Sequence, residues 1–201
     1  GFLEPDALYQ GDAATGKFEK VKSLPPRFDA SGMQVQQFEA TSKDGTMIPY
    51  FVVHKKDIKL DGTNPTLLYA YGGFQVSMLP NYSAGIGCSW LEKGGVYVLA
   101  NIRGGGEFGP KWHESARKEN RQRAYDDFIA VAEDLVAKGV TSPRRLGIQG
   151  GSNGGLLMGA MITQRPHLFR AVVCQVPLLD MRRYNKLLAG AWIPGQPENI
   201  L

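Results

Sequence analysis

The 201-residue sequence is poor in the residues on which several classes of protein depend. Its two cysteines, Cys88 and Cys174, are too few for a disulfide scaffold, and Cys174 lies in an apolar run that predicts an inert thiol buried in the core. The net charge is only +4 and the basic residues are scattered, which argues against a nucleic-acid-binding protein. No apolar run is long enough to cross a membrane and no signal peptide is visible, so we expect a cytoplasmic protein, with the periplasm as the alternative.

Glycine, in contrast, is abundant, with 25 residues, and its main cluster is the segment Gly150–Gly155, which contains the pattern Gly-x-Ser-x-Gly around Ser152. A short strand-like run, residues 145–149, precedes this cluster, and an apolar helix-like run, residues 156–162, follows it. This is the pattern of a nucleophile elbow, in which a strained turn exposes the serine hydroxyl and a Cβ atom at the flanking glycines would clash. We therefore expect Ser152 to be a nucleophile, and the alternative is a glycine-rich connection with an incidental serine.

Four apolar runs predict the central strands of a parallel sheet, because neither face of these runs is polar: residues 66–71, 96–102, 146–149 and 171–176. Apolar residues recur at helical spacing from Tyr125 to Val136, and Gly139 follows as a helix-ending signal. Strands that alternate with helices predict an α/β fold with a mostly parallel sheet flanked by helices. Function in such a sheet lies at the carboxyl ends of the strands, which are here Tyr71–Phe74, Arg103–Gly109, Ser152 and Pro177–Asp180.

The N-terminal part of the sequence divides at about residue 30. Residues 1–30 are polar and proline-rich without a helix or strand period, so we expect a linker or the end of a preceding module. Residues 34–41 and 46–54 are strand-like and flank an Asp44-Gly45 pair, which predicts a hairpin. We assign residues 31–201 to the α/β domain.

Two glycine-rich segments follow the first two predicted strands. Gly104–Gly109 matches the Gly-x-Gly-x-x-Gly pattern, but Pro110 and a long polar stretch follow where a dinucleotide site needs a helix, so we expect a close-packed loop beside the elbow and no cofactor or metal. Acyl transfer requires two donors for the oxyanion, and the backbone N–H of Asn153 is the first candidate. The second is either the Tyr71 hydroxyl or an N–H of the adjacent Gly72-Gly73 turn, while Phe74 lines a pocket or caps the core.

Histidine is scarce, and a serine nucleophile needs a histidine base with an orienting carboxylate. The three histidines are His54, in a hairpin strand and expected to face solvent, His113, and His167, just past the elbow helix. His113 lies at the expected edge of the sheet but precedes Ser152, which reverses the usual order of an α/β-hydrolase. We therefore expect a structural or surface role for each histidine.

Taken together, these motifs resemble the catalytic domain of the prolyl oligopeptidase family of serine peptidases. The matching segments occur in the family's order: Tyr71–Phe74, Pro80–Ser83, Ala100–Gly109, Gly150–Leu157, Gln164–Pro166, Asp180-Met181 and Trp192. The residues beside the serine, Gly151 and Asn153, fit the prolyl branch, because dipeptidyl-peptidase relatives usually carry Trp and Tyr there.

The resemblance implies an α/β-hydrolase fold and an enzyme that hydrolyses short peptides through an acyl-enzyme on Ser152. It assigns the Tyr71 hydroxyl and the Asn153 N–H to the oxyanion hole, and it places Phe74 and Trp192 beside the pocket for a substrate proline. It also makes residues 1–16 similar to the end of a β-propeller, which in relatives limits access to short peptides.

The sequence departs from the family near its C-terminal end. The family's catalytic Asp and His follow the equivalent of Trp192, whereas residues 193–201 leave the family pattern. We therefore expect this chain, taken alone, to hold the nucleophile without its base and to be nearly inactive. One alternative is a non-catalytic, truncated α/β-hydrolase module that self-associates through an exposed sheet edge, and another is a small esterase with His113 as a substitute base.

Overall fold

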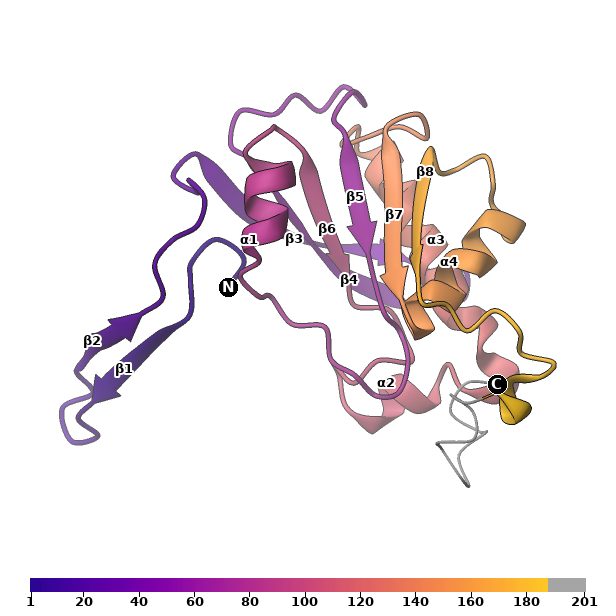
Figure 1. The fold of residues 1–201 in the computed structure, drawn as a ribbon, viewed down its shortest axis with the longest axis horizontal. Helices are drawn as coiled ribbons and strands as arrows, with labels where there is room; N and C mark the ends of the chain where they lie inside the picture. The colour runs from indigo at the N-terminus through magenta and orange to yellow at the C-terminus, as the bar shows by residue number, and fades with distance from the viewer. Residues whose placement is uncertain (188–201) are drawn as a thin grey trace.

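The computed structural model describes residues 1–187, which form a six-stranded sheet with helices on both faces and a separate two-stranded hairpin (Figure 1). The order of the six strands is β3-β4-β6-β5-β7-β8. The pairs β3–β4 and β4–β6 are antiparallel and the remaining three pairs are parallel, which confirms the predicted mostly parallel α/β sheet. The strands are β3 (Met33–Thr41), β4 (Met47–Lys55), β5 (Thr66–Tyr69), β6 (Val96–Ala100), β7 (Leu146–Gly151) and β8 (Ala171–Gln175).

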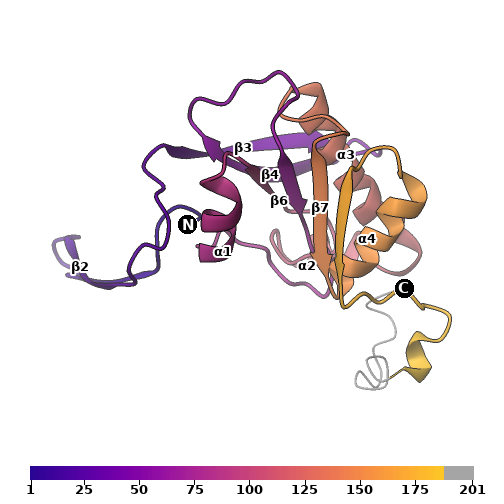
Figure 2. The ribbon, with the colours of Figure 1, turned by 45° about the horizontal axis from the view of Figure 1, so that its top comes forward.

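The two faces of the sheet carry separate apolar clusters. Helices α3 and α4 pack on one face, while α1 and the turn η1 lie on the opposite face together with Phe2 and Phe28 (Figure 2). No helix within residues 1–187 has both the length and the apolar character needed to span a membrane. The helical segments are α1 (Ala84–Ile86), η1 (Gly87–Leu91), α2 (Pro110–Glu114), η2 (Lys118–Asn120), α3 (Gln122–Ala137), α4 (Asn153–Gln164) and η3 (Tyr184–Lys186).

Helix α3 confirms the predicted helix, but its buried stripe is rotated by about one residue from the expected one. Gly139 follows the helix with φ +71°, as the helix-ending signal predicts. Three residues of the expected stripe, Tyr125, Ile129 and Val136, are only half-buried. The buried face carries Ala124, Asp127, Phe128, Val131, Ala132 and Leu135, so it includes one carboxylate.

The predicted hairpin is present as β3 and β4. Its turn is closed by a hydrogen bond from the Ser42 N–H to the Thr46 carbonyl (2.8 Å), and Gly45 takes the positive φ of +86° that such turns require. Strands β5 and β6 end at Tyr69 and Ala100, so Tyr71 and Ile102 lie in the loops that follow these strands.

Residues 1–30 contain a second hairpin that the sequence does not predict. Strands β1 (Ala7–Gly11) and β2 (Phe18–Ser23) pair antiparallel and project away from the main sheet (Figure 1). Nearly every side chain in these strands is exposed, so no alternation of buried and exposed residues marks them in the sequence.

Strand β8 also differs from expectation, because among residues 1–187 it pairs only with β7 and forms an edge of the sheet. Cys174, predicted to be a buried core thiol, is exposed, and its Sγ atom lies 3.3 Å from the Gly155 carbonyl. Val173, the preceding residue, faces the opposite side of the sheet and is also 46% exposed. The prediction for Cys174 is wrong because composition indicates an apolar strand but not whether a neighbour covers it.

Candidate active site

Ser152 lies at the sharp turn between β7 and α4. Its backbone has φ +57° and ψ −114°, a left-handed conformation that is strained for a residue with a side chain. Two hydrogen bonds hold it there: the Ser152 N–H donates to the Gln175 carbonyl (3.0 Å), and the Ser152 carbonyl accepts from the Leu156 N–H (3.1 Å). Helix α4 begins with the next residue, so the half-buried serine sits at its N-terminus.

The flanking glycines permit this turn. A Cβ atom on Gly150 would lie 2.3 Å from the Gly154 carbonyl oxygen, so the strand and the helix approach more closely than any side chain there allows. The expected clash is thus present at Gly150, and the geometry of β7, turn and α4 is that of a nucleophile elbow.

The loop after β5 lies directly against the elbow. The side chain of Asn153 is fully buried, and its Nδ2 donates to the Tyr71 carbonyl (2.6 Å). A Cβ atom on Gly73 would lie only 2.4 Å from the same Nδ2 atom, so the loop needs glycine at this point. The structure therefore brings together Tyr71, Ser152 and Asn153, which the sequence predicts to act in one site.

Of the three aromatic residues predicted for this site, the structure describes Tyr71 and Phe74. The ring of Tyr71 is half-buried at the start of α4, with its Cδ2 atom 3.8 Å from where a Cβ on Gly154 would be. Phe74 is half-buried, and both Phe74 and Gln75 have positive φ values of 53° and 56°. Two consecutive left-handed residues mark this loop as strained. Trp192 lies outside the described residues.

Arg121, at the start of α3, belongs to this site although no local sequence pattern indicates it. Its guanidinium donates from Nη1 to the Gly72 carbonyl (2.5 Å) and from Nη2 to Asn153 Oδ1 (3.0 Å). The same group lies 5.4 Å from the centre of the Tyr125 ring. Arg121 thus links α3 to both the Tyr71–Phe74 loop and the elbow.

A buried ionic cluster supports the next loop, which follows β6. Arg103 is nearly fully buried and donates to both carboxylate oxygens of Asp127, over 2.9 Å from Nε to Oδ2 and 2.6 Å from Nη2 to Oδ1. It also donates to Asp44 (2.6 Å), and Ser42 donates to Asp127 (2.6 Å). Burial alone would lower the pKa of Arg103, but the bonds to Asp127 and Asp44 outweigh it and raise the pKa. The bond to Arg103 also holds the pKa of Asp44 below its ordinary value.

The sequence contains a signal for this cluster, because Asp127 falls on the apolar stripe of α3 between Ala124 and Val131. A carboxylate on a buried helix face requires a buried cation or several donors. Arg103, which follows the apolar strand β6, is the cation that meets this need.

Glu107 connects the loop after β6 to the segment after Phe74. Its Oε1 accepts from the Met78 N–H (3.0 Å), while Oε2 is buried without a hydrogen-bond partner among residues 1–187. Burial raises the pKa of Glu107.

As expected, the glycine-rich loop from Gly104 is close-packed: a Cβ atom on Gly104 would lie 2.4 Å from the Gly72 carbonyl oxygen.

The histidines are engaged elsewhere. His113 is buried in α2, and its Nδ1 lies 2.6 Å from the Gly104 carbonyl oxygen and 3.2 Å from the Gln75 backbone nitrogen. His54 is buried and its two ring nitrogens lie within 2.8 Å of Gln36 and Lys55 oxygens, so the expectation that it faces solvent is wrong. His167 is exposed beyond the far end of α4.

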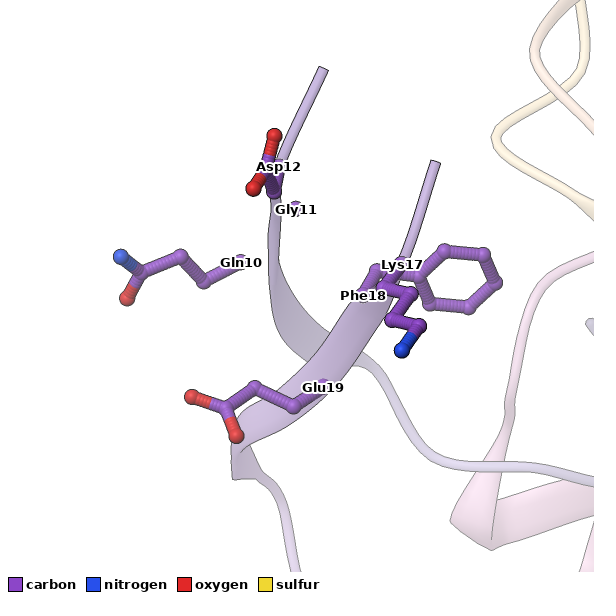
Figure 3. A pocket seen from close by; sticks show the side chains of 6 residues that line it. All are labelled: Gln10, Gly11, Asp12, Lys17, Phe18 and Glu19. Carbon is purple, nitrogen blue, oxygen red and sulfur yellow. The ribbon is translucent and has the colours of Figure 1, made fainter. Parts of the chain in front are cut away.

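Two further features bear on function: whether the described residues could hold a metal ion, and a surface hollow that lies away from the predicted site. Within residues 1–187 no group of three or more His, Cys, Asp or Glu side chains is placed to hold a metal ion. A hollow of about 400 Å³ lies on the projecting hairpin, where Gln10 and Glu19 point to one side and the Phe18 ring to the other (Figure 3). The hollow is formed by exposed residues of β1, β2 and the turn between them, and it contains none of the predicted site residues.

Comparison with known proteins gives consistent matches. The model of a family described as the prolyl oligopeptidase family matches residues 82–199. An uncharacterized peptidase of Sinorhizobium fredii is 68% identical over 191 residues, which cover 95% of this chain and 26% of the relative. The structure of a post-proline cleaving enzyme from Rickettsia typhi superposes with a TM-score of 0.88 at 52% identity, covering 98% of this chain and 29% of that one.

A further structure shows a related protein with a peptide. Prolyl oligopeptidase B from Galerina marginata, bound to a 25mer macrocyclization substrate, superposes with a TM-score of 0.89 at 36% identity, covering 99% of this chain and 29% of that chain. The present chain spans about a quarter of the length of the curated relatives that it matches, since the shares are 26% and 27%.

Proposed function

This chain belongs to the prolyl oligopeptidase family, and on that premise we propose that Ser152 is the nucleophile of a serine peptidase that hydrolyses short peptides. The observation that carries the proposal is the left-handed backbone of Ser152 (φ +57°) at a strand-to-helix turn, packed against the Tyr71–Phe74 loop. The fold is that of the α/β-hydrolase domain found in the family. No cofactor or metal enters this proposal.

The proposed reaction is a two-step acyl transfer. The Ser152 oxygen attacks the carbonyl carbon of the peptide bond and gives its proton to a general base, which leaves a tetrahedral oxyanion. The oxyanion collapses, the C–N bond breaks, and the leaving amine takes the proton from the base. Water then attacks the acyl-enzyme and restores the Ser152 hydroxyl.

Two donors are proposed for the oxyanion. One is the backbone N–H of Asn153, which is the first residue of α4 and so lies among the unpaired N–H groups of the helix N-terminus. The other is the Tyr71 hydroxyl, supported by the position of its ring at the start of the same helix. Phe74 and Trp192 are proposed to line the pocket for a substrate proline.

We propose that the base is a histidine from outside residues 1–187. In the described part of the chain, His113 and His54 are committed to carbonyl or amide oxygens, and His167 lies past the end of α4 away from Ser152. For the same reason we propose that the chain of residues 1–201, taken alone, is nearly inactive. Residues 1–30 are proposed to end a preceding propeller-like module, and residues 31–201 to begin the hydrolase domain.

The oxyanion assignment can be tested by Tyr71→Phe in the natural full-length protein. Loss of one preorganised donor is expected to lower kcat about 10²- to 10³-fold, while KM for a short proline-containing peptide changes little. Steady-state hydrolysis of a fluorogenic peptide measures both constants.

Tyr82→Phe is the matched control, because among residues 1–187 the Tyr82 hydroxyl accepts only the Arg27 N–H (2.7 Å), on the other face of the sheet. This control is expected to keep kcat within about twofold of the wild type, since it touches no proposed oxyanion donor. A Tyr71→Phe variant as active as the Tyr82→Phe control would contradict the role of the Tyr71 hydroxyl.

A further inference from the structure

We propose that Arg121 is a positioning residue that sets the geometry between the two oxyanion donors, the Tyr71 hydroxyl and the Asn153 N–H. This inference rests on the proposed function. It follows from a chain of three hydrogen bonds that joins α3, the loop after β5 and the elbow through one guanidinium and one amide.

The Asn153 side chain is the first link. It is fully buried, its Oδ1 accepts from Arg121 Nη2 (3.0 Å), and its Nδ2 donates to the Tyr71 carbonyl (2.6 Å). These partners allow only one orientation of the amide, because a flipped amide would set two donors against each other at Arg121 and two acceptors at Tyr71. Arg121 therefore dictates which way the Asn153 amide points, and the amide then holds the backbone of Tyr71.

The Gly72 carbonyl is the second link. Arg121 Nη1 donates to it over 2.5 Å, one residue after the carbonyl that the Asn153 amide binds. The Tyr71-Gly72 backbone is thus held at two successive carbonyls, one directly by Arg121 and one through Asn153. A loop with strained residues at Phe74 and Gln75 needs such restraints to keep the Tyr71 ring at the start of α4.

Arginine suits this position better than lysine. Its planar fork places two N–H groups on two acceptors at once, whereas the ammonium of a lysine is a single flexible point charge. Within residues 1–187 no carboxylate pairs with Arg121, and its Nε atom is buried without a partner. The guanidinium is instead oriented by the Tyr125 ring, 5.4 Å away, and by the close approach of Gly104, where a Cβ atom would lie 3.0 Å from Nη1.

The test compares Arg121→Met and Arg121→Lys in the natural full-length protein, with hydrolysis of a short proline-containing peptide as the readout. Misplacement of the oxyanion donors by a fraction of an ångström to an ångström is expected to lower kcat by about 10- to 100-fold, with KM within about threefold. Arg121→Lys keeps the positive charge but loses the planar guanidinium with its two N–H donors, so its kcat is expected to fall nearly as far as that of Arg121→Met. Arg123→Met is the matched control, because Arg123 lies at an exposed position two residues along the chain and, within the described part of the chain, its side chain bonds only to the Ser115 carbonyl.

A double-mutant cycle separates positioning from a merely structural role. If Arg121 acts through the Tyr71 hydroxyl, the factor by which Arg121→Met lowers kcat is expected to be at least about threefold smaller in the Tyr71→Phe background than in the wild type. Equal losses in both backgrounds, unchanged kcat in Arg121→Met, or recovery of full activity by Arg121→Lys would each overturn the inference. A lowered melting temperature with unchanged kcat at a temperature where the variant is folded would overturn it as well. A wild-type protein no more active than its Ser152→Ala variant would instead overturn the proposed function, and this inference with it.

Discussion

Replacement of Ser152 by alanine is expected to abolish peptide hydrolysis in the natural full-length protein. In a serine peptidase the loss of the nucleophile lowers kcat by about 10⁶-fold, because the acyl-enzyme cannot form and only residual oxyanion stabilisation remains. The fold is expected to survive, since among residues 1–187 no side chain hydrogen-bonds to the Ser152 hydroxyl and the turn is held by backbone bonds. Initial rates on a fluorogenic peptide and a thermal melt measure the two effects.

Ser89→Ala is a suitable control for this variant. The Ser89 hydroxyl donates to the Gly85 carbonyl (2.5 Å) in the helical segment on the other face of the sheet, so the same chemical change falls far from the elbow. We expect its kcat to match the wild type. A Ser152→Ala variant that keeps a tenth or more of the wild-type rate would show that Ser152 is not the nucleophile.

The second large effect is on stability, through Asp127→Ala. This change removes the partner of the buried Arg103 guanidinium, which donates to Asp127 through Nε and Nη2, and it also strips the Arg103 N–H of its acceptor (3.0 Å). Breaking a buried ion pair from one side costs about 3–5 kcal/mol, because the remaining charge stays buried without compensation. Asp44 still faces Arg103, but its side chain is 41% exposed and compensates only in part. We therefore expect a large drop in the denaturant midpoint of the hydrolase domain.

The neighbouring residue supplies the control for this prediction. Asp126 carries the same charge one position earlier in α3, but of residues 1–187 only Gln122 bonds to its carboxylate, at the surface. Asp126→Ala is expected to change the free energy of unfolding by less than about 0.5 kcal/mol, as is usual for surface sites. Similar midpoints for the Asp126→Ala and Asp127→Ala variants would mean that the buried cluster does not hold the domain together.

The sequence predicts well the features that depend on local pattern. The strand-to-helix turn around Ser152, the hairpin turn at Asp44-Gly45 and the helix ended by Gly139 all follow from residues close together in the chain. Each of these patterns has a direct steric or hydrogen-bonding cause, so each appears in the structure within a few residues of its expected place.

Other features depend on contacts between residues far apart, which a local pattern does not specify. The Asn153 amide meets the Tyr71 carbonyl across 82 residues, and Arg121 meets Gly72 across 49. Exposure of Cys174 likewise depends on what lies beside β8, and the exposed strands β1 and β2 have no buried face to mark them. Asp127 is the exception, because a carboxylate on an apolar helix stripe is a visible signal for a buried partner.

The central claim, that Ser152 is an activated nucleophile, is tested most directly by mapping the site of covalent labelling. The natural full-length protein would be treated with a fluorophosphonate, which modifies activated serines, then digested and sequenced by mass spectrometry. We predict a single phosphonylated peptide that contains Ser152, and no labelling in the Ser152→Ala variant. A label on any other residue, or a label that persists in Ser152→Ala, would contradict the account.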